Sequence, residues 1–239
     1  LIRTNCEDGI LRELFRSAKI GNLEGNFGMT QSVVTLAAVV LDTMPETKEM
    51  IDWVFQNGEC IPADQPDEIT GGNVLRQIIT QVDRDGVSNE ISPNYSDIWV
   101  GGLTRIVDAL AGYEGYPEMD MYKNPRFIKM LTSLLPLTLS RYSSAQIGDS
   151  GATADNSKYV SAFKILPAFA NTRLPLFAQM LYFINGNKTE GLHYDIFTKD
   201  PNSLEQDVRD VIRENGEYNF DKSEQLCGYG FAALRGGSL

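Results

Sequence analysis

The 239-residue chain is predicted to be mainly α-helical, as an α/α toroid, or part of one, built from helical hairpins. Three observations favour this fold class. Apolar residues recur at helical spacing along most of the chain, polar loops separate these stretches, and only the last segment has the composition of a strand. Successive helices joined by such loops are typical of helical hairpins. No strict repeat in residue identity is present, so a plain helical bundle is the alternative.

In the first half of the chain the helical pattern is interrupted by turn-forming residues. Residues 8–19 carry a single apolar stripe, and residues 29–44 are so apolar that we expect a helix buried on most sides. A third helix opens at Pro45, spans residues 46–55 and ends before Gly58. After a loop rich in Pro, Asp and Gly, helices are predicted over residues 73–82 and 98–110.

In the second half, residues 125–139 form a helix in which Pro136 marks a kink or an end. Residues 156–169 and 174–184 are predicted to be helices. Residues 203–214 fit a helix that is N-capped by Ser203, with acidic Glu205 in its first turn. Residues 225–234 read instead as a strand, which has no partner in this sequence, and we expect it to begin a sheet domain that the chain lacks.

The composition is that of an ordinary globular protein, with a strong acidic excess. The 32 acidic and 21 basic residues give a formal charge of −11, and no basic face of the kind that binds nucleic acid is visible. No apolar run has the length needed to cross a bilayer, so no membrane insertion is predicted. Because the chain starts at Leu1 rather than Met, we expect a mature form or an excised fragment, and the missing signal peptide says little about export.

Histidine and cysteine usage restricts the possible chemistry. His193 is the single histidine, which nearly excludes a Ser-His-Asp triad or a multi-histidine metal site. Cys6, Cys60 and Cys227 show no metal-binding spacing. Unpaired structural thiols are the favoured interpretation, and one disulfide stays open. The sequence predicts neither a metal nor a cofactor, so any catalysis must rest mainly on carboxylates, tyrosines, amides, Arg or Lys.

Two polar, helix-breaking segments stand out between the apolar stretches. Residues 25–31 read Gly-Asn-Phe-Gly-Met-Thr-Gln, and residues 85–95 read Asp-Gly-Val-Ser-Asn-Glu-Ile-Ser-Pro-Asn-Tyr. Each places amides, a carboxylate or a phenol where a helix begins. Helix starts expose free backbone N–H groups and attract anions, so two starts facing one cleft would suit an acidic sugar.

Together with residues 147–151 and 227–235, these segments resemble the heparinase II/III superfamily of polysaccharide lyases. In that family an Asn near the start of a buried helix is followed by His. Asn26 matches the Asn, whereas Phe27 and Thr30 stand where the His is expected. The family's DG…E.SP.Y-like segment is matched by Asp85, Gly86, Glu90, Ser92, Pro93 and Tyr95. The glycine-rich strand with Gly230-Phe231-Ala232 and Arg235 is similar to the family's passage into its β-sandwich.

The resemblance implies an N-terminal α/α toroid followed by a C-terminal β-sandwich. Residues 1–215 would be an incomplete toroid, and residues 216–239 a linker and the first strand of a sandwich that is otherwise missing. We expect further toroid helices before Leu1 as well. The family acts on polymers outside the cytoplasm, which implies a periplasmic or secreted protein. An acidic polysaccharide or oligosaccharide is the implied partner, and the oligomeric state is left open.

Lyases of this kind cleave the bond next to a uronic acid by β-elimination, which builds negative charge on the sugar acid. On this reading Asn26 donates to the uronate carboxylate, with Gln31 nearby, and Tyr95 shuttles the proton. A free phenol has a pKa of roughly 10, so Tyr95 would need nearby positive charge or hydrogen bonds to act as a base. The hypothesis therefore predicts that Asn26 and Tyr95 face one cleft of positive potential.

Further substrate-binding candidates are Glu90, Asn94, Asp149, Tyr113 and Tyr116. The two loop tyrosines could stack on the apolar faces of sugar rings.

Structural roles are the alternatives for several candidates. Asn26 could instead cap the following helix, Gln31 could lie on a helix surface, and Tyr95 could pack in a first turn. Glu90 could bond backbone N–H groups, and Asp149 could simply form a turn. His193 is expected to be structural.

Two other functions compete with the lyase hypothesis. A glycoside hydrolase on an α/α toroid would need two carboxylates roughly 5–10 Å apart, for which Glu90 and Asp149 are the candidate pair. A non-catalytic glycan-binding protein is favoured by the absence of His from the segment around Asn26. An unsaturated uronate product would separate elimination from hydrolysis.

Overall fold

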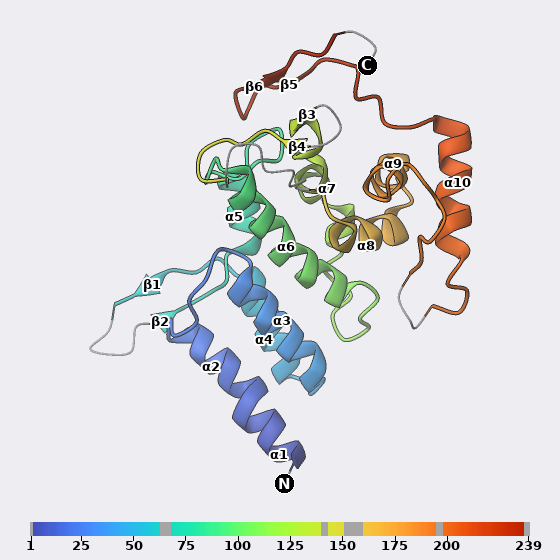
Figure 1. The fold of residues 1–239 in the computed structure, drawn as a ribbon. Helices are drawn as coiled ribbons and strands as arrows, with labels where there is room; N and C mark the ends of the chain where they lie inside the picture. The colour runs from blue at the N-terminus through green and yellow to red at the C-terminus, as the bar shows by residue number, and fades with distance from the viewer. Residues whose placement is uncertain (1, 63–67, 140–142, 151–159, 195–197, 237–239) are drawn as a thin grey trace. The chain divides into compact units, whose positions relative to one another are not determined.

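The computed structural model describes residues 2–62, 68–139, 143–150, 160–194 and 198–236 (Figure 1). The protein is mainly helical, with a few short strands. Its internal contacts divide it into two compact units. The first comprises Leu1–Met130 and Ile147–Ser150, and the second comprises Leu131–Gln146 and Gly151–Leu239. The contacts divide near residue 130, and the domain boundary at residue 216 stays a prediction.

The first unit is built from helices joined by short turns and one small hairpin. Its elements are α1 (Ile2–Cys6), the π-helix η1 (Glu7–Arg12), α2 (Glu13–Lys19), α3 (Met29–Leu41), α4 (Glu46–Phe55), β1 (Cys60–Ile61), β2 (Glu68–Ile69), α5 (Val74–Thr80), α6 (Pro93–Leu110), the 3-10 helix η2 (Met121–Lys123) and most of α7 (Pro125–Thr132). Strands β1 and β2 pair antiparallel inside the region predicted to be a loop. The predicted helices of this half are therefore confirmed, with ends that differ by a few residues.

The second unit combines helices with two further hairpins. Its elements are η3 (Leu135–Leu137), β3 (Thr138–Leu139), β4 (Ser143–Ser144), α8 (Ala162–Thr172), α9 (Pro175–Ile184), α10 (Ser203–Asn215), β5 (Glu224–Leu226) and β6 (Phe231–Ala233). Helix α7 ends at Thr132, so the helix predicted to reach residue 139 stops early, and Pro136 lies in η3. The predicted start of α8 at residues 156–159 lies outside the described residues.

Helices α3, α4 and α6 form the centre of the first unit, and α3 lies alongside both of the others (Figure 1). The α3–α6 crossing is close because glycines meet there. A Cβ added at Gly102, inside α6, would stand 2.7 Å from the backbone carbon of Gly28, at the start of α3. Gly28 also has a φ of 93°, which side chains rarely adopt. The two glycines therefore fix where α3 begins on α6.

The expectation that residues 29–44 are buried on most sides was wrong. Met29, Val33, Leu36 and Val40 recur at helical spacing on α3 and are between 36% and 69% exposed. The opposite face is the buried one, with Val34, Ala38 and Leu41 all at most 4% exposed. One face of α3 is therefore buried and the other is exposed, although both faces are apolar. Among the described helices none is long and apolar enough to cross a membrane.

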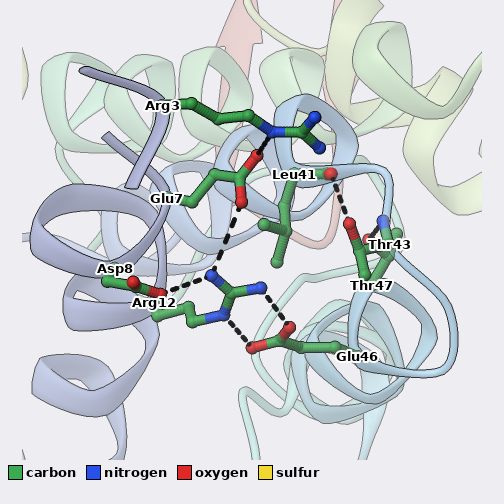
Figure 2. Close-up of polar contacts among 8 residues, drawn as sticks. All are labelled: Arg3, Glu7, Asp8, Arg12, Leu41, Thr43, Glu46 and Thr47. Atoms are coloured by element: carbon green, nitrogen blue, oxygen red, sulfur yellow. Dashed lines mark hydrogen bonds and ion pairs between the residues drawn. The ribbon is translucent and has the colours of Figure 1, made fainter. Parts of the chain in front are cut away.

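An ionic network ties the N-terminal helices to the start of α4, as Figure 2 shows. The Arg12 guanidinium donates to both carboxylate oxygens of Glu46, at 2.8 and 2.9 Å, and to Asp8 at 2.6 Å. The hydrogen bond to Glu46 is the main reason that the pKa of Arg12 is raised. Nearby, the Thr47 hydroxyl accepts from the Thr43 N–H at 2.9 Å, which organises the turn between α3 and α4.

The C-terminal segment is a hairpin rather than a lone strand. Strands β5 and β6 pair antiparallel, with Leu226 opposite Phe231, so the prediction of a strand without a partner was wrong. Arg235 holds the hairpin to η3 by donating to the carbonyls of Pro136, at 2.8 Å, and Thr138, at 3.0 Å. Arg235 also pairs with Glu224 at 2.6 Å. Within the second unit the hairpin is thus anchored by partly buried polar contacts.

Candidate functional site

The start of α6 is joined to the loop at residues 147–150 by a small hydroxyl network. The Ser92 hydroxyl donates to the Asp149 carbonyl at 2.8 Å and lies 2.8 Å from the Ser150 hydroxyl. The Asn94 N–H reaches the same Ser150 hydroxyl at 3.5 Å. Both serines are buried, so the loop is fixed on the helix start although 57 positions separate Ser92 from Asp149. Two of the sequence motifs therefore meet in one place.

Ile91, immediately before this helix start, has an unusual backbone conformation. Its φ is 66°, which is a genuine outlier for a β-branched residue, and its side chain is 60% exposed. Such strain persists only where the surroundings enforce it, and it is often found at functional sites. Here it turns the chain from Glu90 into α6, which begins with Pro93 at its first position.

Tyr95 and Asp149 form the central pair of this site. The Tyr95 hydroxyl donates to the Asp149 carboxylate at 3.3 Å, and both side chains are accessible to solvent. The negative charge of Asp149 is the largest cause that raises the pKa of Tyr95, followed by the hydrogen bond itself and a smaller effect of Glu90. Tyr95 is therefore a protonated phenol at neutral pH. The condition under which Tyr95 could act as a base, a pKa lowered by nearby positive charge, is not met, because its charged neighbours are carboxylates rather than cations.

Glu90 is held by the indole of a buried tryptophan. The Trp99 Nε1–H donates to a carboxylate oxygen of Glu90 at 2.7 Å, so the partner of Glu90 is a side chain rather than a turn N–H. The Phe27 ring packs against the Trp99 ring with centroids 4.6 Å apart. Phe27 thus fills, with an apolar contact, the position where the family resemblance predicts His.

The first polar segment contributes less to the site than predicted. Gly28, not Asn26, is the N-cap of α3, and the Asn26 side-chain amide has no hydrogen-bond partner among the residues described. Both polar atoms of the Gln31 side-chain amide are hydrogen-bonded. Its oxygen accepts from the Gly28 N–H at 3.0 Å, and its nitrogen donates to the Gly72 carbonyl at 2.9 Å. These bonds favour a structural role for Gln31.

The two helix starts are offset along α6. Gly28 packs against Gly102, which lies nine residues after Pro93 and hence about 13 Å further along the helix axis. The Phe27–Trp99 contact likewise joins the first segment to the body of α6, beyond the end of the second segment. The start of α3 therefore lies against the middle of α6 and not beside the start of α6, where the prediction of two converging helix starts would place it.

Both loop tyrosines are bonded to carboxylates of the helical core. The Tyr113 hydroxyl donates to Asp42 at 2.5 Å, and burial together with this bond raises its pKa to about 12. Tyr116 is only 6% exposed, donates to Asp52 at 2.7 Å and stacks on Phe55 with centroids 6.4 Å apart. Burial is the main reason that the pKa of Tyr116 is raised. Tyr116 is therefore a packing residue, and Tyr113 keeps only part of its surface for a ligand.

The sequence reasoning missed the residues that assemble the site. Ser92 was noted only as part of a motif, and Ser150 was not nominated, yet these hydroxyls join the two segments. No local pattern could have paired positions so far apart. The strain at Ile91 is likewise invisible in the sequence, because a β-branched residue gives no signal of a positive φ.

The remaining candidates add no second centre in the described part of the chain. Asn94 is exposed in the first turn of α6, beside Tyr95. His193 is exposed, with its Nδ1 3.0 Å from the Gly191 carbonyl, in keeping with a structural role. Cys6 and Cys227 are exposed free thiols, and Cys60 is also exposed. No group of three or more His, Cys, Asp or Glu residues that could hold a metal ion is found where the chain is described.

Comparisons of this chain with protein-family models, curated proteins and solved structures give no match.

Proposed function

We propose that the chain belongs to a carbohydrate-active protein that cleaves uronic-acid-containing glycans by β-elimination, with Tyr95 and Asp149 as its acid–base pair. The observation that carries the proposal is the hydrogen bond from the Tyr95 phenol to the Asp149 carboxylate, at 3.3 Å on an accessible helix start. The motif resemblance supports the substrate class. The site chemistry differs from the sequence hypothesis, because a phenol with a raised pKa serves as an acid rather than a base.

The proton movements balance without a cofactor. The Asp149 carboxylate takes the proton from the sugar carbon beside the uronate carboxyl group. The bond to the leaving sugar oxygen then breaks, and that oxygen takes the proton of the Tyr95 hydroxyl. Because a phenol binds a proton far more tightly than a carboxylate, the phenolate recovers its proton from Asp149. The pair returns to its starting state, and the products are an unsaturated sugar and a new hydroxyl end.

Charge stabilisation is assigned to the start of α6. Pro93 has no N–H, and the Asn94 N–H reaches the Ser150 hydroxyl, so the Tyr95 N–H is the first-turn donor assigned to the ligand. Helix starts of this kind favour bound carboxylates. A uronate carboxylate at this position would place its sugar ring beside Tyr95 and Asp149. Asn26 is proposed to contribute its unpaired amide from the neighbouring segment.

The architecture and location are part of the same proposal. We assign the helices to an incomplete α/α toroid, on the basis of sequence-adjacent helices that pack on each other, such as α3 and α4. A periplasmic or secreted site of action is part of the same assignment. The C-terminal β5–β6 hairpin, anchored by Arg235, would then be the beginning of the sheet domain.

Two readouts on one set of reactions test the reaction type. The 239-residue chain is incubated with glucuronate- and galacturonate-containing polysaccharides, and both ultraviolet absorbance of unsaturated uronate and new reducing ends are followed. Elimination raises both signals in step. Reducing ends without absorbance would replace the proposal by hydrolysis. If neither signal rises, affinity electrophoresis on the same polymers shows whether binding without turnover replaces it.

Hydrolysis and binding each have one observation in their favour. The charged groups that raise the pKa of Tyr95 are both carboxylates, Asp149 and Glu90, which suits a hydrolase better than a site for an acidic sugar. An observation against hydrolysis is that the Glu90 carboxylate already accepts a hydrogen bond from the Trp99 indole. A glycan-binding protein without turnover is favoured by Phe27, which occupies the expected His position with an apolar contact.

A further inference from the structure

A second candidate site lies in the other compact unit. A surface pocket of about 480 Å³ is lined by the end of α9, by the turn at residues 187–190 and by one face of α10. Its volume is within the range of about 300–1,000 Å³ that is usual for small-molecule sites. All of its lining residues belong to the unit that contains α8, α9 and α10. Its geometry therefore does not depend on the Tyr95 site.

The walls of this pocket are held in place by hydrogen bonds before any ligand binds. The Asn185 amide donates to the carbonyls of Lys188, at 2.8 Å, and Glu190, at 3.1 Å. Asn187 sits in the left-handed region, with a φ of 59°, and its N–H donates to the Tyr182 carbonyl at 3.0 Å. A turn that is already ordered loses little entropy when a ligand binds to it.

Helix α10 is tied to this turn by Arg209. Its guanidinium donates to the hydroxyl of Thr189 at 3.3 Å, and Thr189 itself is only 7% exposed. Ile212 and Arg213 follow at helical spacing on the same face of α10 and also line the pocket. The pocket thus combines an apolar part, from Ile212 and the Tyr182 ring, with a polar rim.

The charges of the rim define what it can recognise. Arg209 is paired with Glu205, and Arg213 is paired with Asp210 at 2.8 Å. Lys188 has no ion-pair partner among the described residues, so its ammonium is the cation of this rim that is free to bind a ligand. Exposed ion pairs are weak, and an Arg keeps spare donors beyond its first partner.

The other polar groups of the rim fit hydroxyl groups. Glu190 lines the pocket with an acceptor carboxylate, and Asn187 adds an amide that can both donate and accept. A simple inorganic anion would meet the cations but would also be repelled by Glu190. A neutral sugar would leave the Lys188 ammonium without an ion-pair partner. The lysine, the carboxylate and the amide together suit a ligand with one anionic group and several hydroxyls.

We propose that this pocket binds a small polyhydroxylated ring that carries one anionic group, either a sugar acid or a sugar phosphate. The anionic group lies between Lys188 and Arg213. The hydroxyls face Glu190 and Asn187, and the apolar face of the ring lies on Tyr182. The site is additional to the Tyr95–Asp149 pair and does not rest on the function proposed for it.

Isothermal titration calorimetry with four probes tests this assignment. Glucuronate and glucose 6-phosphate represent the two sources of charge, glucose lacks the charge, and inorganic phosphate lacks the hydroxyls. We expect saturable binding of at least one charged sugar, at least about tenfold tighter than glucose or phosphate, since one charge-assisted hydrogen bond has about this value. The charged sugar that binds more tightly identifies the source of the anionic group.

Variants locate the binding. Lys188→Ala should raise the dissociation constant of the charged sugar about tenfold, whereas Lys222→Ala, an exposed lysine of the same unit outside the pocket, should leave it unchanged. Thermal melts of both variants show that they are folded. The assignment is overturned if neither charged sugar binds, if phosphate alone binds as tightly, or if the two variants bind equally well.

Discussion

The phenol of Tyr95 donates a hydrogen bond to the carboxylate of Asp149, although the two residues are 54 positions apart. The contact exists because the buried hydroxyls of Ser92 and Ser150 fix the Asp149 loop on the start of α6. It gives an acidic chain a neutral proton donor directly beside a proton acceptor. This pairing is the basis of the chemistry assigned to the site.

The pKa of Tyr95 should fall when the charge of Asp149 is removed. Because that charge is the largest cause of the raised value, Asp149→Asn should move the pKa back toward the ordinary value of 10.0. Tyrosine ring ¹³C NMR across alkaline pH measures it. Asp42→Asn is the matched control, which should lower the pKa of Tyr113 and leave Tyr95 unchanged. An unchanged Tyr95 pKa in Asp149→Asn would show that the pair does not form in solution.

Glu90 should prove to be important for stability. Glu90→Ala removes the acceptor of the buried Trp99 indole N–H and should lower the free energy of unfolding by about 1 kcal/mol. Glu90→Gln keeps an acceptor oxygen and should restore most of the loss. Urea denaturation followed by tryptophan fluorescence measures both variants. Equal stability of Glu90→Ala and the unchanged chain would speak against this contact.

The glycine contact between α3 and α6 should tolerate no side chain. Gly102→Ala places a Cβ 2.7 Å from the backbone of Gly28, so the helices must separate, at a cost of about 1–3 kcal/mol. Gly9→Ala is the control, since a Cβ at Gly9 would meet nothing within 4 Å. Chemical denaturation should show a loss of stability only for Gly102→Ala. A Gly102→Ala protein as stable as the control would contradict the close crossing.

Alkaline pH should weaken the fold through Tyr113. Its pKa is raised from 10.0 to about 12, so the folded chain holds this proton more tightly than the unfolded chain. The resulting stabilisation is complete below pH 10 and is lost as the pH rises to 12. Urea denaturation at several alkaline pH values should therefore show a shallower pH dependence for Tyr113→Phe. Identical slopes for the two proteins would refute the raised pKa of Tyr113.

The helical class and most of the described helices were predictable because they depend on local periodicity. Pro93 and Gly28 mark helix starts through their own backbone preferences, which a sequence displays directly. The composition of residues 225–234 predicts a single strand because it does not show that the chain turns at Gly230, which has a φ of 79°.

The site was predictable only in its parts. Tyr95, Glu90 and Asp149 were all nominated, but their partners depend on distant contacts with Ser150 and Trp99. The sign of the Tyr95 pKa shift follows mainly from the Asp149 carboxylate beside it and could not be inferred from residue types alone. Tyr116 illustrates the same limit, since a tyrosine in a loop gave no sign that it would be buried on Phe55.

The most direct test compares two tyrosine variants in the elimination assay on the best uronate polymer. Tyr95→Phe removes the proposed proton donor and should lower kcat/KM by about 100-fold or more, the usual range for a lost general acid. Tyr113→Phe removes a second phenol that is also bonded to an aspartate and should change kcat/KM less than about twofold. If Tyr95→Phe keeps the activity of the unchanged chain, the Tyr95–Asp149 pair is not the acid–base centre.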